Sequence, residues 1–271
     1  MQESFLQPFL THQVIRWDES SSLSLRENLI LEEPLSIKIQ NRPYSVVMRT
    51  PGDEIPHVAG FCLTEGIVDC SDDFSSINFS EETDNNVVTV SLKEPRQHKI
   101  LLPLERQGSS SRGSSAICGK EMVKDLCQSI PPLTDERKID AGMAIGCLDK
   151  FFPNQHLGEV TRASHAAALF SFDFDLLSIA EDVGRHNAID KAIGKLFLGD
   201  NLQEAFLLVL SSRISYDLVQ KAGRARIPFI LAISRPTSLA LQVALKLKMT
   251  MACLAKPKGL YVFCGEHRLG N

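Results

Sequence analysis

Apolar and polar residues alternate along the first third of the chain. Every second side chain is apolar over residues 35–39, the run breaks at 41–43, and it resumes over 44–48. A period of two is typical of a strand that buries one face. Two further apolar runs, 77–79 and 87–92, flank an acidic stretch. The pattern therefore predicts two β-hairpins in this part of the chain.

Between the two hairpins the apolar spacing becomes helical. The recurring positions end just before Gly66, and glycine commonly follows the last turn of a helix. These positions are Ile55, Val58, Ala59, Cys62 and Leu63. We expect one helix here, with Cys62 in its buried face.

The second half of the chain alternates between strand patterns and helical patterns. This order favours an α/β fold in which helices pack on a sheet. Strands are predicted within 168–179, 206–210, 228–233, 249–254 and 260–263, and helices within 120–128, 185–197, 215–224 and 236–246.

One low-complexity stretch divides the chain. Residues 107–116 read QGSSSRGSSA, and such a composition is typical of a flexible segment. We expect a β-rich N-terminal region with one helix over 1–110. A Ser/Gly-rich loop and the start of a cysteine-bearing helix follow over 111–128, and a layered domain over 129–271. The predicted fold class is α/β, with a mixed α+β sheet.

The composition is that of a folded protein, with 44% apolar and 23% charged residues. The N-terminus has no basic stretch followed by an apolar run, and the longest strongly apolar segment, 227–233, is much shorter than a membrane span. We expect a protein that is neither exported nor embedded in a membrane.

The net charge of −4 conceals an uneven distribution. From residue 213 to residue 268 there are ten Lys and Arg against two acids, a local excess of +8, so the remainder sums to −12. A basic block in an acidic protein predicts a local anion site rather than general affinity for nucleic acid. A solvated basic helix face is the competing interpretation.

The seven cysteines include no C-x-x-C pair. Structural zinc needs closely spaced ligand pairs, and disulfide frameworks belong mainly to secreted chains. We expect neither here, and we expect most of the thiols to be buried.

Cys118 stands apart because it precedes Gly119 and Lys120, where a helix is predicted to begin. The positive end of a helix dipole and the charge of Lys120 both favour the thiolate, which is the form that attacks a persulfide sulfur. Cys127 would lie on the opposite face of the same helix. Cys118 is therefore a candidate reactive thiol, with an incidental cysteine as the alternative.

Residues 181–191 form a dense polar segment between a predicted strand and a predicted helix. His186 and Asp190 are one helical turn apart and are positioned to hydrogen-bond. Glu181 and Asp182 are candidates to cap the helix, and Arg185 is a candidate to receive an anion. A capped helix with a surface ion-pair network is the alternative interpretation.

His165 lies among small residues, as does the first ligand of the zinc deaminases, in which a His-x-Glu helix precedes a C-x-x-C pair. The third position here is Ala167, and no C-x-x-C follows. A satisfied core histidine is therefore the default, and a zinc deaminase is a distant alternative.

Arg213 and Ser215 follow a predicted strand, and Asp217 and Lys221 lie in the first turns of the next predicted helix. This is the mouth of an α/β sheet, where ligands often bind. A simple N-cap is the alternative role for Ser215.

Together these segments resemble the FdhD family of formate dehydrogenase accessory proteins. The resemblance spans nearly the whole chain, and the run Glu-Asp-Val-Gly-Arg-His-Asn-Ala-Ile-Asp-Lys at 181–191 is its most specific part. The other matching stretches are 48–53, 60–61, 64–67, 114–120, 164–170, 213–221 and 234–240.

The resemblance implies a cytoplasmic sulfurtransferase that acts as a carrier rather than as a metabolic enzyme. Such a protein accepts persulfide sulfur from a cysteine desulfurase. It passes the sulfur to the molybdenum bis(guanine dinucleotide) cofactor before that cofactor enters formate dehydrogenase. The resemblance also implies a deaminase-like fold for the larger domain, a homodimer, and no tightly held metal.

The resemblance assigns residues to these roles. Cys118 would carry the sulfur. The cofactor, a polyanion with pyrophosphate groups, would be bound by His165, Arg185, His186, Arg213 and the C-terminal stretch Leu254, Ala255, Lys256, Pro257, Lys258 and Gly259.

Two departures from the family pattern bear on function. The family motif is Cys-Gly-x-Cys-Gly-Lys, but Ser115 takes the first cysteine position here and only Cys118 remains. A serine cannot hold a persulfide, so either Cys118 acts alone or the protein binds cofactor or dehydrogenase without transferring sulfur. In the C-terminal stretch, where relatives favour a basic, glycine-containing turn followed by Asn, Gly259 is followed by Leu260 and Tyr261.

Overall fold

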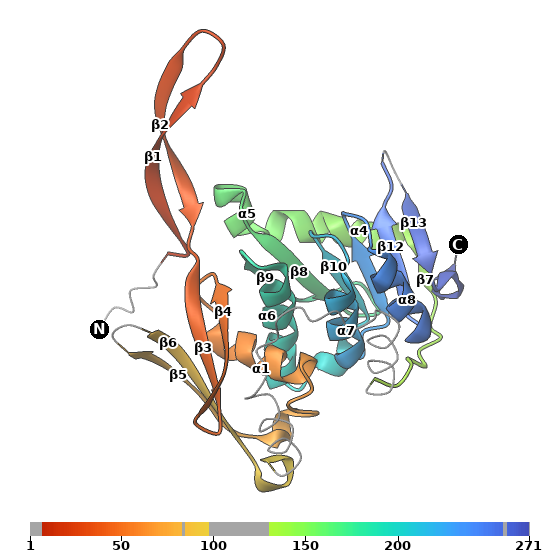
Figure 1. Cartoon of the computed structure of the whole chain (residues 1–271). Coiled ribbons are helices and arrows are strands. Elements are labelled where there is room, and N and C mark those ends of the chain that lie inside the picture. Colours follow the sequence, from red (N-terminus) through yellow and green to blue (C-terminus); the bar gives the residue numbers. More distant parts are fainter. Residues whose placement is uncertain (1–6, 83–84, 98–129, 257–258, 271) are drawn as a thin grey trace.

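The structure is a computed structural model that describes residues 7–82, 85–97, 130–256 and 259–270. It contains a projecting two-stranded arm, a four-stranded sheet and a six-stranded sheet, with helices between and around the two sheets (Figure 1). The expected loop at 107–116, the expected helix at 120–128 and Cys118 all lie outside the described residues. No helix in the described part of the chain is both long and apolar enough to cross a membrane.

The four-stranded sheet confirms both predicted hairpins. Its strand order is β4-β3-β6-β5, with β3 and β4 antiparallel, β5 and β6 antiparallel, and β3 and β6 parallel. Alternate side chains of β3 are buried, as the period of two predicted. The strands are β3 (Glu33–Ile39), β4 (Arg42–Arg49), β5 (Phe74–Glu82) and β6 (Asn85–Leu92).

The six-stranded sheet has the order β13-β12-β11-β10-β8-β9. Neighbours β10, β11 and β12 are parallel, and the other pairs are antiparallel. This mixed sheet confirms the predicted fold class. Its strands are β8 (His165–Phe170), β9 (Leu176–Asp182), β10 (Leu207–Leu210), β11 (Phe229–Ala232), β12 (Thr250–Leu254) and β13 (Leu260–Cys264).

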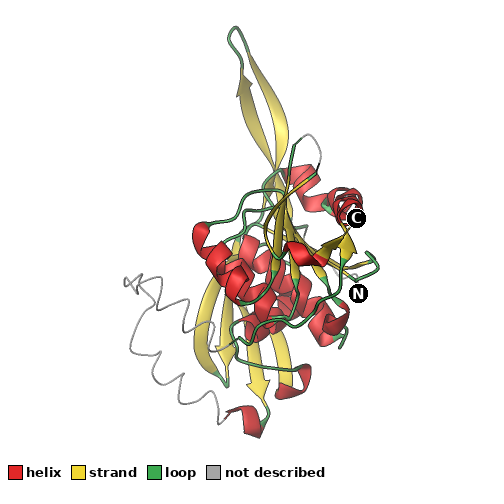
Figure 2. Cartoon of the chain, turned by 90° about the vertical axis from the view of Figure 1, so that its right-hand side faces the viewer, coloured by secondary structure: helices red, strands yellow, loops and turns green. Residues whose placement is uncertain are grey.

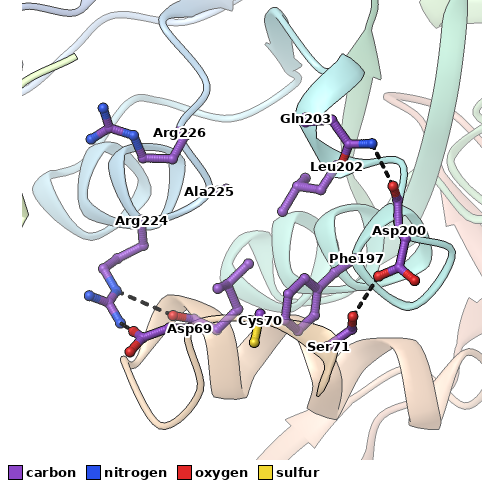
Figure 3. Close-up of a pocket in the computed structure, with 11 residues that line it drawn as sticks. Asp69, Cys70, Ser71, Phe197, Asp200, Leu202, Gln203, Arg224, Ala225 and Arg226 are labelled. Carbon is purple, nitrogen blue, oxygen red and sulfur yellow. Dashed lines mark hydrogen bonds and ion pairs between the residues drawn. The ribbon is translucent and has the colours of Figure 1, made fainter. Parts of the chain in front are cut away.

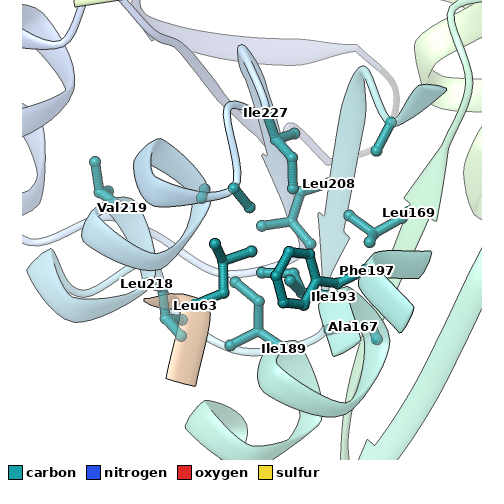
Figure 4. Close-up of a cluster of buried hydrophobic side chains, with 14 of the residues drawn as sticks. Leu63, Ala167, Leu169, Ile189, Ile193, Phe197, Leu208, Leu218, Val219 and Ile227 are labelled. Carbon is teal, nitrogen blue, oxygen red and sulfur yellow. The ribbon is translucent and has the colours of Figure 1, made fainter. Parts of the chain in front are cut away.

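Helices cover both faces of this sheet because alternate apolar side chains of its strands point to opposite sides. On one side Leu169, Leu208 and Ile230 belong to a cluster that includes side chains of α6 (Arg185–Leu198), α7 (Tyr216–Arg224) and α8 (Ser238–Lys246). Figure 4 shows Ile189, Ile193 and Phe197 of α6 in that cluster. On the other side Ala168, Val209 and Leu231 pack with α4 (Ala141–Phe151).

Six helices and strands were not anticipated by the sequence pattern. Helices α4 and α5 (His156–Thr161) lie in a stretch that contains three glycines and a proline, which obscure the helical spacing. The short strands β7 (Ile139–Asp140) and β14 (Leu269–Gly270) pair in parallel. The arm formed by β1 (Phe9–Trp17) and β2 (Ser22–Ile30) was also unexpected, and both views show it extending from one end of the molecule (Figures 1 and 2).

Helix α1 (Glu54–Thr64) joins the two sheets, as it lies between the four-stranded sheet and α6. The predicted helix and the burial of Cys62 are confirmed. Two glycines allow α1 and α6 to approach closely. A Cβ atom on Gly60 would lie 2.0 Å from the carbonyl oxygen of Asp190, and one on Gly194 would lie 1.8 Å from that of Pro56. Backbone therefore packs against backbone where the two parts of the chain meet.

Replacing Gly194 by alanine should lower the free energy of unfolding by about 1–3 kcal/mol, because the added methyl group must push α1 away from α6. Gly146→Ala in α4 is the matched control, since nothing lies within 4 Å of its added Cβ. The control should be neutral or slightly stabilising, as alanine favours helix. Urea denaturation measures both, and equal stability of the two variants would contradict the close packing.

Candidate functional site

One edge of the six-stranded sheet collects the ends of four strands. Strands β10, β11 and β12 run in the same direction, and β9 shares that direction because it is antiparallel to β8. Their carboxyl ends, Leu210, Ala232, Leu254 and Asp182, therefore meet at one edge. His165, the first residue of β8, pairs with Asp182 at the same edge. In open α/β sheets this carboxyl edge is where ligands usually bind.

Each of the four strands is followed by a cation. Arg185 follows β9, Arg213 follows β10, Arg235 follows β11 and Lys256 follows β12. Arg213, Arg235 and Lys256 are exposed, whereas Arg185 is half-buried. Helices α6 and α7 also begin here, so their positive dipole ends add to the charge. The edge is suited to an anion that carries several negative groups.

The predicted binding residues are brought together by this topology. His165, Arg185, His186 and Arg213 lie at the edge, as do Leu254, Ala255, Lys256 and Gly259 of the β12–β13 turn. The turn closes through a hydrogen bond from the Ala255 amide to the Gly259 carbonyl, 2.8 Å long. Pro257 and Lys258 lie outside the described residues. Strands β12 and β8 are three positions apart in the sheet, about 14 Å at ~4.8 Å per strand, so only an extended ligand could contact both ends.

Three buried polar atoms at this edge have no hydrogen-bond partner among the described residues. They are Arg185 Nε, His186 Nε2 and Ser215 Oγ. Ser215 occupies the N-cap position of α7, but its side chain makes no capping hydrogen bond. Because buried polar groups are normally paired, unpaired donors beside four cations indicate a place where ligand oxygens could bind.

The two histidines of the edge are neutral near pH 7. Burial and the positive charge of Arg185 lower the pKa of His165, and the negative charge of Asp182 acts weakly against them. Burial and Arg185 also lower the pKa of His186, whereas Asp217 raises it. Both rings can therefore donate one hydrogen bond and accept another.

Asp182 fixes the start of α6 through a buried hydrogen-bond network. One carboxylate oxygen lies 2.7 Å from Lys191 Nζ and accepts a 3.1 Å bond from the Thr50 amide. The other oxygen accepts 2.8 Å bonds from the Gly184 amide and the Asn187 side chain. Lys191 also donates to the Thr50 carbonyl at 2.7 Å. The segment at 181–191 is thus held by buried contacts, which corrects the alternative of a surface ion-pair network.

The expected capping of α6 by Glu181 was wrong. Successive residues of a strand point to opposite faces, so Glu181 points away from α6. It accepts 2.7 Å hydrogen bonds from the amides of Leu157 and Gly158 and from the Ser164 hydroxyl. Glu181 therefore caps α5, while the N-cap of α6 is Gly184.

The expected hydrogen bond between His186 and Asp190 was also wrong. Asp190 pairs with Lys221 Nζ at 2.8 Å and accepts a 2.8 Å bond from the Thr64 hydroxyl. A buried carboxylate is better stabilised by an ammonium group than by a neutral imidazole. His186 Nε2 instead lies 3.9 Å from Asp217 Oδ2. A cavity of about 170 Å³ beside the edge is lined in part by His186, Asp190, Asp217 and Lys221.

His57 of α1 is fully buried near both ion pairs. Burial, followed by the charges of Lys191, Lys221 and Arg49, holds the pKa of His57 well below its ordinary value. Neither ring nitrogen has a hydrogen-bond partner among the described residues. The folded protein therefore keeps this imidazole neutral.

Four of the five described cysteines are poor nucleophiles. Burial raises the pKa of Cys147, Cys253 and Cys264 to about 11, and it raises the pKa of Cys62 further. Their thiols stay protonated near neutral pH. Cys70 is the exposed one, and Cys118 and Cys127 lie outside the described residues.

Cys70 borders a second hollow, at the opposite edge of the sheet (Figure 3). This cavity of about 270 Å³ also contains Arg224 and Arg226. Both cations already have hydrogen-bond partners within the chain. Arg224 donates to Asp69 and to the Leu63 carbonyl, and Arg226 donates to the carbonyls of residues 131 and 132. The carboxyl edge, with its exposed cations and unpaired donors, is therefore the better candidate for an anion.

Sequence reasoning missed one contributor to the edge. Arg235 lies over the ring of Tyr261, 3.9 Å from its centroid, and both residues are exposed. The available signal was the position of Arg235 directly after a buried strand, which matches that of Arg213. His165 lies on a strand rather than on a helix. Within the described ranges, no group of three His, Cys, Asp or Glu side chains is placed to hold a metal ion.

Comparison with known proteins shows which family this chain is similar to. The model of the FdhD/NarQ family matches residues 30–270. A relative from Streptomyces avermitilis named Sulfur carrier protein FdhD is 32% identical, covering 95% of this chain and 94% of its own. One of the same name from Saccharolobus solfataricus is 31% identical, covering 94% and 96%.

A solved structure supports the fold. The crystal structure of a formate dehydrogenase accessory protein from Desulfotalea psychrophila is similar, with a TM-score of 0.77. The similarity covers 97% of this chain and 99% of that one at 21% identity.

The carboxyl edge should bind inorganic pyrophosphate, and salt should weaken that binding. Arg213→Ser should reduce the affinity about tenfold, as expected for the loss of one charge-assisted hydrogen bond. Lys246→Ser is the control, because Lys246 is exposed at the opposite end of α8. Calorimetric titration measures both, and an equal loss in the two variants would mean unspecific attraction.

The free energy of unfolding should fall in mild acid. Below about pH 6.5, the ordinary pKa of histidine, the unfolded chain binds a proton at His57 that the folded chain excludes. Stability is therefore complete above that pH and declines below it, by up to ~1.4 kcal/mol per pH unit for one group. Urea denaturation between about pH 7 and pH 5.5 measures the slope, which His57→Gln should reduce. An unchanged slope in the variant would show that His57 is protonated in the fold.

Proposed function

This chain belongs to the FdhD/NarQ family, and on that premise we propose that it is a cytoplasmic sulfur carrier for the maturation of formate dehydrogenase. The sulfur comes from a cysteine desulfurase, and Cys118 holds it as a persulfide. The acceptor is the molybdenum bis(guanine dinucleotide) cofactor, which is the substrate of the transfer and binds at the carboxyl edge. The protein is thus a sulfurtransferase-type carrier rather than a metabolic enzyme.

The observation that carries this proposal is the row of cations, one after each of β9, β10, β11 and β12. A dinucleotide cofactor presents pyrophosphate groups at separated points. Exposed guanidinium and ammonium groups bind phosphate well, and Arg does so with two parallel hydrogen bonds. The span of about 14 Å between β12 and β8 suits a ligand of that length. Unpaired donors at Arg185 and Ser215 provide further contacts.

The sulfur step needs a thiolate that can be reached. The thiolate of Cys118 attacks the outer sulfur of the donor persulfide and forms a new S–S bond to it. The S–S bond of the donor breaks, and the donor cysteine leaves as a thiolate, so no net oxidation or reduction occurs. Burial excludes Cys62, Cys147, Cys253 and Cys264 from this role. Cys118 is favoured over Cys70 by the family resemblance.

A second function remains a candidate because Ser115 stands in the first cysteine position of the family motif. In that case the chain binds the cofactor, or the dehydrogenase before the cofactor enters it, without carrying sulfur. The same edge would serve, and Cys118 would be dispensable. The two functions differ only in the thiol chemistry, so a cysteine variant separates them.

Incubation of the full chain with a cysteine desulfurase and cysteine should add one sulfur to Cys118, detected by mass spectrometry of the peptides. Cys118→Ser should abolish the modification, while Cys70→Ser, the exposed-thiol control, should retain it. In cells that lack their own carrier, Cys118→Ser should fail to restore formate dehydrogenase activity. Full restoration by Cys118→Ser, with no sulfur added to the chain, would favour the binding-only function. Sulfur added to another cysteine would contradict the assignment of the carrier role to Cys118.

A further inference from the structure

Asp217 places a carboxylate beside the cations of the carboxyl edge. It lies in the first turn of α7, four residues after Arg213, and α7 begins at this edge. A negative charge there repels phosphate, whereas Arg185 and Arg213 attract it. An acidic residue in the first turn also stabilises a helix through its dipole, but that role needs no particular neighbour. The side chain that Asp217 faces indicates a second role.

That neighbour is His186, in the first turn of α6. His186 Nε2 lies 3.9 Å from Asp217 Oδ2, a distance too long for a hydrogen bond. Nε2 is buried and has no hydrogen-bond partner among the described residues, although 41% of the side chain is exposed. Both residues line the cavity of about 170 Å³, which leaves room for a small movement of either side chain. Because buried nitrogens are normally paired, the two side chains form an incomplete pair.

Charged groups on three helices surround the His186 ring. They are Arg185 and Asp190 of α6, Asp217 and Lys221 of α7, and Glu65 of α1. Burial and then Arg185 lower the pKa of His186 most, Lys221 adds to their effect, and Asp217 and Glu65 act against it. Asp190 is paired with Lys221. An anion bound at Arg185 would offset the positive charge of that residue and so raise the pKa of His186.

We propose that the binding of a polyanion at the carboxyl edge is accompanied by the uptake of one proton at His186, and that Asp217 holds the charged ring in place. This inference rests on the proposed function, because it concerns the same anion site. The only covalent bond formed is N–H, and the proton comes from the solvent. A neutral imidazole has one N–H, whereas the protonated ring has two. One donates to Asp217, and the other is available to an oxygen of the anion as a charge-assisted hydrogen bond.

The uptake of a proton changes how the affinity depends on pH. By linkage, a ligand that raises the proton affinity of His186 binds more tightly when the proton is present. The added affinity is therefore complete at low pH, and it is lost as the pH rises above the pKa of His186 in the complex. An acid that served only the helix dipole would change the affinity by the same factor at every pH. The pH profile therefore separates the two roles of Asp217.

Calorimetric titration of the full chain with pyrophosphate at about pH 6 and about pH 8, on either side of the ordinary pKa of histidine, tests the coupling. Pyrophosphate itself binds protons in this range, so each variant is compared with the wild type at the same pH. The ratio of the dissociation constants of His186→Gln and the wild type should be near one at the higher pH. It should rise about fivefold or more at the lower pH.

Asp217→Asn removes a negative charge from the edge and also the partner of the charged ring. It should bind pyrophosphate at least as tightly as the wild type at about pH 8, but it should gain less affinity than the wild type at about pH 6. His267→Gln is the matched control. His267 Nε2 also lies 3.9 Å from a carboxylate oxygen, that of Glu136, and its side chain is 47% exposed, but it follows β13 at the opposite edge of the sheet. The control should follow the wild type at both pH values.

Circular dichroism should show that the three variants remain folded, because the replaced side chains are partly exposed. A ratio for His186→Gln that is the same at both pH values overturns the proton coupling and leaves the anion site in place. An unchanged pH profile in Asp217→Asn overturns the role of Asp217. A wild type that binds no pyrophosphate at either pH overturns the coupling together with the anion site on which the proposed function rests.

Discussion

The buried carboxylate of Asp182 joins three segments that are far apart in sequence. It ends β9, accepts hydrogen bonds from the start of α6, and accepts another from Thr50, 132 residues away. Lys191 neutralises it at 2.7 Å. Because an unpaired buried charge costs several kcal/mol, these segments are stable only when assembled together. The same contact therefore sets the first turn of α6 and with it the positions of Arg185 and His186. The pair of Asp190 and Lys221, together with the contact between Gly60 and Gly194, extends this linkage to α1 and α7.

The periodicity of the chain was sufficient to locate the strands and helices that bury a regular face. The alternation in 35–39 and the helical spacing that ends before Gly66 both correspond to elements with one buried side. The signal of the arm was irregular, since Leu23 and Leu25 alternate with polar residues in β2 but Val14 and Ile15 are adjacent in β1 and point to opposite faces. Helix α4 was not predicted because Gly142 and Gly146 interrupt the helical spacing of its apolar residues. Local pattern therefore predicts an element only where the core imposes the pattern.

The site could be predicted in position but not in detail. Arg213, directly after a predicted strand, indicated the mouth of the sheet as a place where ligands bind, and the family resemblance assigned Arg185 and Lys256 to the cofactor. The partners of the polar side chains could not be found in this way. Asp190 has a helical neighbour at His186, yet it pairs with Lys221, 31 residues away, and with Thr64, 126 residues away. A buried carboxylate pairs with the nearby group that best offsets its loss of hydration. The spacing of residues along the sequence does not show which of several candidate partners lies close enough in the fold to do so.

The distribution of cations over four separate loops has a consequence for how this surface can change. Arg185, Arg213, Arg235 and Lys256 each lie on their own connection, and the strands behind them fix the backbone independently. In the proposed complex with a polyanion, loss of one of these charges would weaken binding by a fraction and leave the other three cations in place. The affinity of such a surface for an anion falls in small steps as its cations are mutated one by one. A metal centre, by contrast, loses its metal when one ligand is removed. Single amino-acid substitutions among these cations can therefore change which anion is preferred without abolishing anion binding.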